Sequence, residues 1–415
     1  MAMALGASLG AGSIVAGAST ADESSARGLE PMSTPALTGA GEIALGGAAL
    51  PSQAVESLVA IAPAKLYFGV NRAIVFHVGA MTVAPDERLR VVLLDATGQR
   101  VRLGSRDSVE ISVASPAGGG TQPREFDLAA LIPELWITPP RGVIWVQLES
   151  VARIEPAPRG VGEVRREPGP NDPPAPAPEP TEAVRRIGAP VVLEPLRSPL
   201  RAELDERVPA APRIAFPKPL QATINAFTGY RAYVDHRVIL STEAGDIRVR
   251  LRPDAAPNTA WNFRFLSQGG FYDDAVFHRV VPVGRIAGKG FVIQGGDPTG
   301  TGEGTPGYEL PFEPSALRHD FGVLSMARDT GPDTAGAQFF IALSREETAR
   351  LDGLYTAFGQ IEGEESSRAV RAIASAALLP GDADRPEKPV RIMRVRLEPS
   401  PALMVESVSQ AAPTR

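Results

Sequence analysis

The sequence contains no cysteine, which excludes disulfides, thiolate zinc sites, iron–sulfur clusters and a cysteine nucleophile. Its four histidines, His77, His236, His278 and His319, show no metal-ligand spacing, so no metal site is expected. Positive charge is not in excess, because 42 Lys and Arg stand against 48 Asp and Glu, for a formal net charge of -6. A general nucleic-acid-binding protein needs cationic surface to displace counterions, so nucleic acid is not an expected partner.

Apolar runs are short, and none reaches the length of a good transmembrane helix, so no stable membrane span is expected in the mature protein. Residues 1–21 carry no charge and end in small residues of the kind that signal peptidases cut. We therefore expect a signal peptide and export to the periplasm or cell envelope of a bacterium. The alternative is a cytoplasmic protein with a disordered N-terminus or a misassigned start, because no Lys or Arg precedes the weakly apolar run.

Proline is abundant, and its excess is concentrated in one region. Residues 155–220 hold 16 of the 40 prolines, including the run from Pro173 to Pro180. Such a run favours the extended polyproline II conformation and is typical of a semi-rigid spacer; a ligand for an SH3-like partner is the alternative. The predicted organisation is a signal peptide at 1–21, a low-complexity segment at 22–56, a first domain at 57–154, a Pro-rich linker at 155–186, a connector or last part of the first domain at 187–233, a second domain at 234–399 and a disordered tail at 400–415.

The first domain is predicted to be a small antiparallel β-sandwich-like structure. Short β-branched and aromatic runs alternate with turn residues, and helical periodicity is almost absent. Trp136 and Trp145 are expected in the core, and the isolated His77 is expected to be structural. The sequence does not identify a partner for this domain. The predicted strands are 65–68, 73–78, 89–94, 101–103, 109–113 and 143–148, with 191–193 as a candidate last strand.

The second domain has the pattern of a closed β-barrel with capped ends. Apolar and arginine residues alternate over 247–251, and a turn joins them to 238–242, which predicts a hairpin with one buried face. Residues 257–268 predict a helix that ends at two glycines, and 365–377 predict a second helix. About eight strands and two helices suit a barrel of this size. The further strand-like runs are 276–281, 291–294, 323–327, 339–343 and 390–397.

Five short motifs in the second domain carry the functional information. In chain order they are Phe-His-Arg-Val-Val-Pro at 277–282, Gly-Phe-Val-Ile-Gln-Gly-Gly-Asp-Pro at 290–298, Leu-Ser-Met-Ala-Arg at 324–328, Gly-Ala-Gln-Phe-Phe-Ile at 336–341 and Leu-Asp-Gly-Leu-Tyr-Thr-Ala-Phe-Gly at 351–359. Together they strongly resemble the cyclophilin family of peptidyl-prolyl cis/trans isomerases. The resemblance implies an eight-stranded antiparallel β-barrel capped by two helices, so the whole chain is expected to be mainly β.

The resemblance also implies an isomerase without a cofactor that acts on X-Pro bonds of proline-containing polypeptides. Rotation about such a bond breaks amide conjugation at a cost of about 18 to 20 kcal/mol, so the catalyst has to favour the twisted state. By resemblance, Arg279 is the catalytic residue, donating to the prolyl nitrogen, which regains a lone pair on twisting. The implied substrate-binding residues are Phe291, Val292, Phe340 and Leu351 for the proline ring, Gln294 and Gln338 for the substrate backbone, the main chain of Ala327 and Arg328 for the extended peptide, and Tyr355 beside them.

Two features depart from the family pattern. Residues 283–289 lengthen the turn that follows Arg279, which is short in most cyclophilins. If the strands remain in register, the insertion is a flap beside the site, with Arg285 and Lys289 favouring acidic substrates; if the register slips, Arg279 points elsewhere. Arg350 stands where many eukaryotic members have a tryptophan that contacts cyclosporin, so weak inhibition by that drug is expected.

The sequence is therefore compatible with three functions. The first is an isomerase that assists the folding of unfolded or extended polypeptides, and it is favoured by Arg279 in its Phe-His-Arg context. The second is a non-catalytic, proline-peptide-binding or envelope-attached protein on a cyclophilin fold, favoured by the insertion. The third places the main function in the first domain, as an adhesive or carbohydrate-binding sandwich.

Overall fold

The computed structural model describes residues 59–79, 81, 87–111, 124–154, 181–197, 227–382 and 384–404. The predicted signal peptide, the low-complexity segment, most of the Pro-rich linker and most of the tail lie outside the described residues. By its contacts the chain divides into Met1–Ser52 and Gln53–Arg415, and all described residues belong to the second unit. Within the described part, no helix combines the length and apolarity needed to cross a bilayer.

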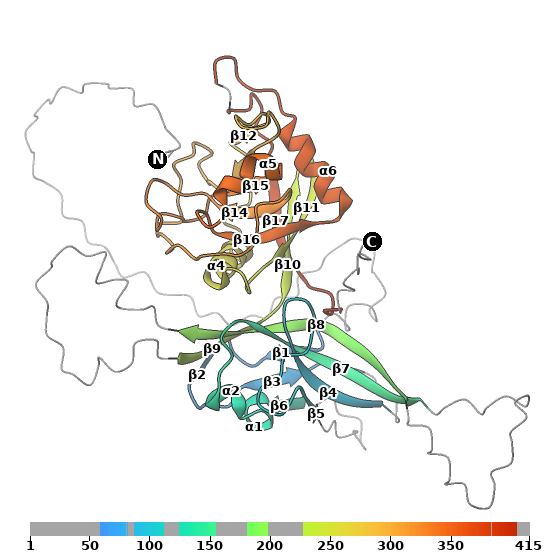
Figure 1. The fold of residues 1–415 in the computed structure, drawn as a ribbon. Helices are drawn as coiled ribbons and strands as arrows, with labels where there is room; N and C mark the ends of the chain where they lie inside the picture. The colour runs from blue at the N-terminus through green and yellow to red at the C-terminus, as the bar shows by residue number, and fades with distance from the viewer. Residues whose placement is uncertain are drawn as a thin grey trace, which may run out of the picture. The chain divides into compact units, whose positions relative to one another are not determined.

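The N-terminal region forms two antiparallel sheets that share one apolar core (Figure 1). The smaller sheet has the order β1 (Ile61–Pro63), β3 (Val75–Val78) and β6 (Arg124–Asp127). The larger sheet has the order β2 (Tyr67–Gly69), β9 (Phe227–Val234), β8 (Thr181–Arg197), β7 (Ile144–Ile154), β4 (Glu87–Leu94) and β5 (Ser108–Ile111). Two short helices, α1 (Leu128–Leu131) and α2 (Glu134–Ile137), follow β6. This arrangement confirms the predicted β-sandwich-like structure.

The aromatic core of this region differs in part from the prediction. Trp145 is buried, but it lies in a small separate cluster with Val92 and Tyr233. Trp136 is partly buried against the main core, where it contacts Tyr230 with ring centroids 5.2 Å apart. The run at 101–103 forms no strand in the described part of the chain, only an isolated bridge at Leu103.

Strand β8 begins inside the range predicted for the linker and lies in the interior of the larger sheet. A central strand normally excludes proline, because its missing N–H breaks the ladder. Here Pro190 lies at a β-bulge, between the pairings of Val191 with Val146 and of Ile187 with Leu148. Its missing N–H therefore interrupts the ladder at a place where pairing is already broken, and the proline is tolerated.

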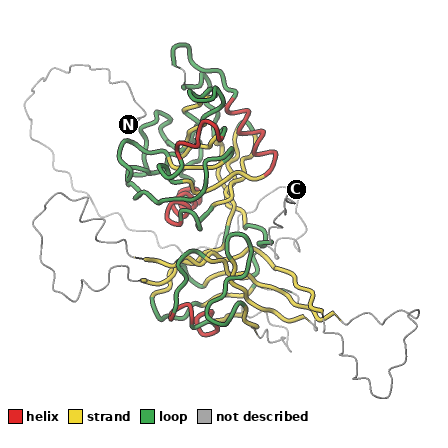
Figure 2. Tube along the Cα trace, in the orientation of Figure 1, coloured by secondary structure: helices red, strands yellow, loops and turns green. Residues whose placement is uncertain are grey.

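The C-terminal region forms one antiparallel eight-stranded sheet that curves as a half-barrel (Figures 1 and 2). Its order is β12 (Arg279–Val281), β13 (Val292–Gly295), β15 (Phe339–Ala342), β14 (Val323–Met326), β16 (Ala357–Glu362), β11 (Gly245–Leu251), β10 (His236–Thr242) and β17 (Ile392–Pro399). Backbone hydrogen bonds bring its two ends together, from the Phe277 amide to the Val390 carbonyl at 2.9 Å and from the Val280 amide to the Asp384 carbonyl at 2.8 Å. The predicted eight-stranded fold is confirmed.

Two helices pack against the core of this sheet. Helix α4 (Pro257–Gln268) has the predicted bounds, because proline suits the first helical turn and Gly270, with φ of 74°, takes up the left-handed conformation after the helix. Helix α6 (Gly363–Ala374) begins slightly before the predicted range. Phe263 of α4 packs among Tyr272, Phe339 and Phe358, with centroid distances of 5.0 to 5.2 Å. Two short turns of helix, α5 (Arg345–Thr348) and η2 (Ala349–Leu351), follow β15.

Candidate active site

Strands β12 and β13 keep their register across the inserted turn. Arg279 pairs with Gln294, and Val281 pairs with Val292, as adjacent antiparallel strands require. The insertion at 283–289 is therefore accommodated in the turn alone, and of the two alternatives considered, the strands remain in register. Because Arg279 and Gln294 are direct cross-strand neighbours, their side chains lie on the same face of the sheet.

The polar side chains predicted for the site form a connected row. Arg279 Nη1 lies 3.4 Å from Gln294 Oε1, and Gln294 Nε2 donates to Gln338 Oε1 at 3.1 Å. Gln338 Nε2 in turn donates to the carbonyls of Gly302 and Gly304, at 2.7 and 3.1 Å. These hydrogen bonds therefore link Arg279 on β12, Gln294 on β13 and Gln338 just before β15. The last two bonds connect Gln338 to the glycine-rich loop that follows β13.

That glycine-rich loop is organised by Asp297, whose side chain is fully buried. Its carboxylate accepts hydrogen bonds from the amide and hydroxyl of Thr299, at 2.7 and 2.8 Å, and from the amide of Gly302 at 2.6 Å. Burial alone would raise the pKa of Asp297, but these bonds and one from the amide of Gly304 lower it to about 2. A Cβ on Gly304 would lie 1.8 Å from Asp297 Oδ1, so only glycine fits there.

The apolar side chains predicted for the proline ring form a small cluster separate from the barrel core. Val292, Phe340 and Leu351 are buried within it. The edge of Phe340 meets Tyr355, with ring centroids 5.8 Å apart. Val281, Phe291, Ala327 and Tyr355 are only partly buried around it, so the cluster reaches the surface. The structure thus brings all ten predicted site residues to one face of the domain, around this cluster and the row that ends at Arg279.

Comparison with known proteins finds relatives of the C-terminal region. The family model described as cyclophilin type peptidyl-prolyl cis-trans isomerase/CLD matches residues 237–397. A peptidyl-prolyl cis-trans isomerase of Synechococcus elongatus is 48% identical over 137 residues, covering 33% of this chain and 88% of that protein. Peptidyl-prolyl cis-trans isomerase A of Mycobacterium tuberculosis is 40% identical over 175 residues, covering 38% of this chain and 90% of that protein. A crystal structure of a Cryptosporidium parvum cyclophilin covers 40% of this chain at 31% identity, with a TM-score of 0.35.

The chain belongs to the cyclophilin family. Its C-terminal region is a peptidyl-prolyl cis/trans isomerase domain, as the resemblance implied. The family match begins at residue 237, after the end of β9, and so does not include the N-terminal sheets.

The cyclophilin domain also contains a buried hydrogen-bonded network that sequence reasoning missed. His319 Nδ1 donates to Asp352 Oδ1 at 2.9 Å, and its Nε2 forms a hydrogen bond with Ser325 Oγ at 3.0 Å. The imidazole stacks on Phe340 with centroids 5.9 Å apart. Arg345 donates to Asp352 and, with His319, holds the pKa of that carboxyl well below its usual range. Ser325 and His319 are fully buried, so these two side chains support the floor of the pocket and are not exposed to substrate, whereas Asp352 is partly exposed.

A second missed residue is Asp384, which contacts the predicted catalytic residue directly. Its Oδ2 accepts hydrogen bonds from Arg279 Nη2 at 2.8 Å and from Arg279 Nε at 3.1 Å. Asp382 shapes this turn by accepting from the amides of Asp384 and Arg385, both at 3.2 Å. No motif marks Asp384, because it is 105 residues from Arg279 and meets it only through barrel closure. The guanidinium is thus held on two sides, by Asp384 and by Gln294.

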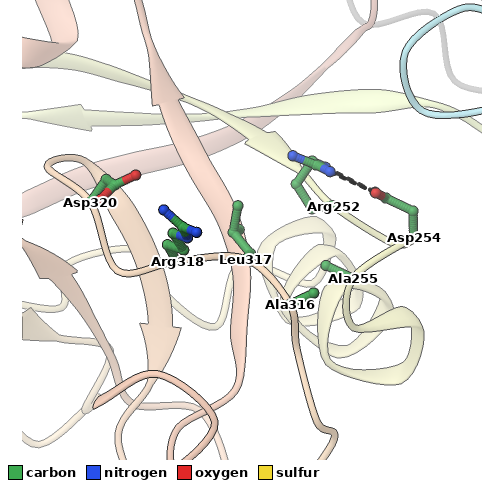
Figure 3. Close-up of a pocket in the computed structure, with 7 residues that line it drawn as sticks. All are labelled: Arg252, Asp254, Ala255, Ala316, Leu317, Arg318 and Asp320. Carbon is green, nitrogen blue, oxygen red and sulfur yellow. Dashed lines mark hydrogen bonds and ion pairs between the residues drawn. The ribbon is translucent and has the colours of Figure 1, made fainter. Parts of the chain in front are cut away.

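A surface hollow of about 380 Å³ lies elsewhere on the cyclophilin domain, between the segment before α4 and the segment 316–320 (Figure 3). Arg252 and Asp254 form an ion pair at 2.6 Å along one side, and Arg318 and Asp320 lie on the other. None of the predicted site residues lines it. In the described residues no group of three or more His, Asp or Glu side chains could hold a metal ion.

Proposed function

We propose that the C-terminal domain isomerises X-Pro bonds in unfolded or extended polypeptides and so assists protein folding. The observation that carries this proposal is the position of Arg279, which is fixed by Asp384 and Gln294 beside the apolar cluster of Val292, Phe340 and Leu351. A proline ring in that cluster would present its amide bond to the guanidinium. The side chain of Arg279 is 21% exposed, so it is largely desolvated but still reachable by a substrate.

The proposed mechanism requires no covalent intermediate. In either planar state the prolyl nitrogen shares its lone pair with the carbonyl, and in the twisted state the lone pair is localised and accepts a hydrogen bond. A donor fixed in advance at Arg279 therefore stabilises the twisted state more than either planar state. Gln294 and Gln338 would hold the substrate backbone, and the main chain of Ala327 and Arg328 would pair with the extended peptide. Leu351, Phe291 and Tyr355 would close the pocket around the ring.

We expect the isomerase rate to be independent of pH near neutrality. His278 and His319 are buried, which lowers the pKa of each imidazole below its ordinary value of 6.5, so both are neutral above that pH. The proposed step moves no proton, so kcat/KM should stay within about twofold between pH 6.5 and 8.5. Because the folded-state pKa values are lowered, acidification through 6.5 reduces the free energy of unfolding instead. A bell-shaped profile centred near pH 7 would contradict this mechanism and indicate acid–base catalysis.

The folding role is tested by the refolding of a protein whose slow phase is set by an X-Pro bond. The full chain at substoichiometric concentration should accelerate that phase and leave the fast phases unchanged. If the full chain accelerates X-Pro isomerisation in short peptides but not the slow refolding phase, the isomerase activity stands and the proposed folding role is wrong.

The alternative is a domain that holds proline-containing segments without useful turnover. It is favoured by the inserted turn, which places seven extra residues beside the pocket, and by the ion pair that occupies two donors of Arg279. This alternative predicts saturable binding of X-Pro peptides without acceleration of their isomerisation.

A further inference from the structure

The insertion at 283–289 is anchored to the segment that forms one side of the pocket. Glu347, whose side chain is fully buried, accepts hydrogen bonds from the amides of Ile286, at 3.1 Å, and Ala287. A Cβ on Gly284 would lie 2.2 Å from the Glu347 carboxyl carbon, so the turn closes tightly over this carboxylate. The insertion and the helical turns α5 and η2 therefore form one continuous wall beside Leu351 and Phe291.

Arg350 lies where this wall meets the pocket. Its guanidinium carbon is 4.5 Å from the centroid of the Phe291 ring, and its Nε donates to the Glu347 carbonyl at 3.2 Å. The stacking and this bond fix the side chain, although it remains exposed. The outer edge of the guanidinium thus faces solvent at the rim of the apolar cluster, within reach of a residue next to a bound proline.

The acidic groups of this wall are already engaged, so the positive charge of Arg350 is not compensated locally. Glu346 pairs with Lys289, which removes that lysine as the source of an acidic preference. The Glu347 carboxylate is occupied by loop amides, and Asp352 pairs with Arg345.

Two other arginines near the pocket, Arg328 and Arg279, have most of their charge or donors already engaged. On the far side of the pocket, Arg328 stacks on Tyr355 and donates to the carbonyls of Asp329 and Leu354. Its donors are thus largely occupied by its own backbone surroundings. Arg279 is compensated by Asp384.

We propose that Arg350 is a specificity-determining residue that selects X-Pro segments with an acidic residue next to the proline. The proposal rests on the proposed isomerase function. A carboxylate beside the proline would meet the outer edge of the guanidinium, which offers paired donors suited to a carboxylate. An exposed pair of this kind changes kcat/KM by up to about fivefold.

The test measures kcat/KM of the full chain on peptides with Glu, Gln or Lys directly before or directly after the proline. At low ionic strength we expect the Glu peptide to exceed the Gln peptide by about threefold to fivefold at one of the two positions. The preference should fall in 1 M salt, where the screening length is about 3 Å. Arg350→Gln should abolish the preference, and Arg350→Glu should reverse it in favour of Lys.

The matched control is Arg394→Gln, which removes an exposed arginine on β17 of the same domain and should leave the ratio unchanged. Arg285→Gln tests the exposed arginine of the insertion and should alter the ratio less than Arg350→Gln. A Glu preference that persists in Arg350→Gln, or no preference at either position, would overturn the proposal. Absence of acceleration on every peptide would instead remove the isomerase function on which it rests.

Discussion

Replacing Arg279 with alanine is expected to lower kcat/KM for an X-Pro peptide by about 100-fold to 1000-fold, the loss typical of removing one fixed donor from a transition state. Peptide binding should weaken far less, because the apolar cluster and the two glutamines remain. The fold should persist, since the lost ion pair with Asp384 is partly exposed and such pairs contribute about 1 kcal/mol or less. The measurement is kcat/KM and peptide affinity on the same full-length protein.

Two further variants separate charge from geometry at this position. Arg279→Lys keeps the positive charge but loses the planar fork that reaches Asp384 and Gln294 together, so its rate should lie between wild type and alanine. Asp384→Asn keeps an acceptor for Arg279 and should retain most of the activity. If Arg279→Ala binds peptide and isomerises it at the wild-type rate, Arg279 is not the catalytic donor.

Replacing Asp297 with alanine is expected to lower the free energy of unfolding of the cyclophilin domain by about 3 kcal/mol or more. The change removes a fully buried carboxylate that accepts from the amides of Thr299 and Gly302, and a hydrogen bond to a charged group contributes about 1.5 to 3 kcal/mol. Activity should fall as well, because the loop supplies the carbonyls of Gly302 and Gly304 that hold Gln338. Hydrogen exchange across a urea series, read on β13 and β15, measures this domain separately from the N-terminal sheets.

Asp95→Ala is the matched control. Asp95 accepts from the amide and hydroxyl of Thr97, as Asp297 does from Thr299, but its turn is open to water. Water can replace that carboxylate, so the change should cost about 0.5 kcal/mol or less, read in the same urea series on β4 and β7 of the N-terminal sheet that contains this turn. If Asp297→Ala and Asp95→Ala lower the free energy of unfolding equally, burial of the Asp297 carboxylate is not what makes its hydrogen bonds stabilising.

The pH dependence of the Asp297 contribution follows from its lowered pKa. The folded-state pKa of about 2 lies below the ordinary value of 3.8, so the stabilisation is complete above about pH 4. It is lost as the pH falls from there toward 2, and Asp297→Ala should lack this part of the acid transition.

The helix at 257–268 and the order of the barrel motifs were predictable because local signals and tertiary structure agree there. Proline at the first turn, apolar residues facing the core and two glycines at the end define α4 without reference to other segments. The ten site residues could be named because their types recur in a fixed order in the family. Their convergence around one cluster is the new information that the fold provides.

The partners of those residues could not be predicted. Asp384 reaches Arg279 because 274–280 and 384–392 are joined by backbone hydrogen bonds, and nothing near Asp384 in the sequence signals this. The hydrogen-bonded trio likewise joins Asp352 to the segment that contains His319 and Ser325, which lies 27 or more residues earlier in the sequence.

The composition of β8 is misleading, because Gly188, Pro190 and Pro195 are typical of a spacer. The bulge opposite Gln147 makes Pro190 acceptable inside a sheet, and the Gln147 side-chain amide donates to the carbonyls of Ile187 and Gly188. Bulge positions depend on the partner strand, so a single run of sequence does not reveal them.

The central claim, that the Arg279 site turns over X-Pro bonds, is tested most directly by magnetisation exchange between the cis and trans forms of a short Ala-Pro peptide. The uncatalysed exchange takes tens of seconds or longer and gives no exchange signal on the timescale of this measurement. With a small amount of the full chain, we predict exchange signals that grow with protein concentration and vanish in Arg279→Ala. Binding of both forms without exchange signals would contradict the account and favour a domain that only holds its peptide.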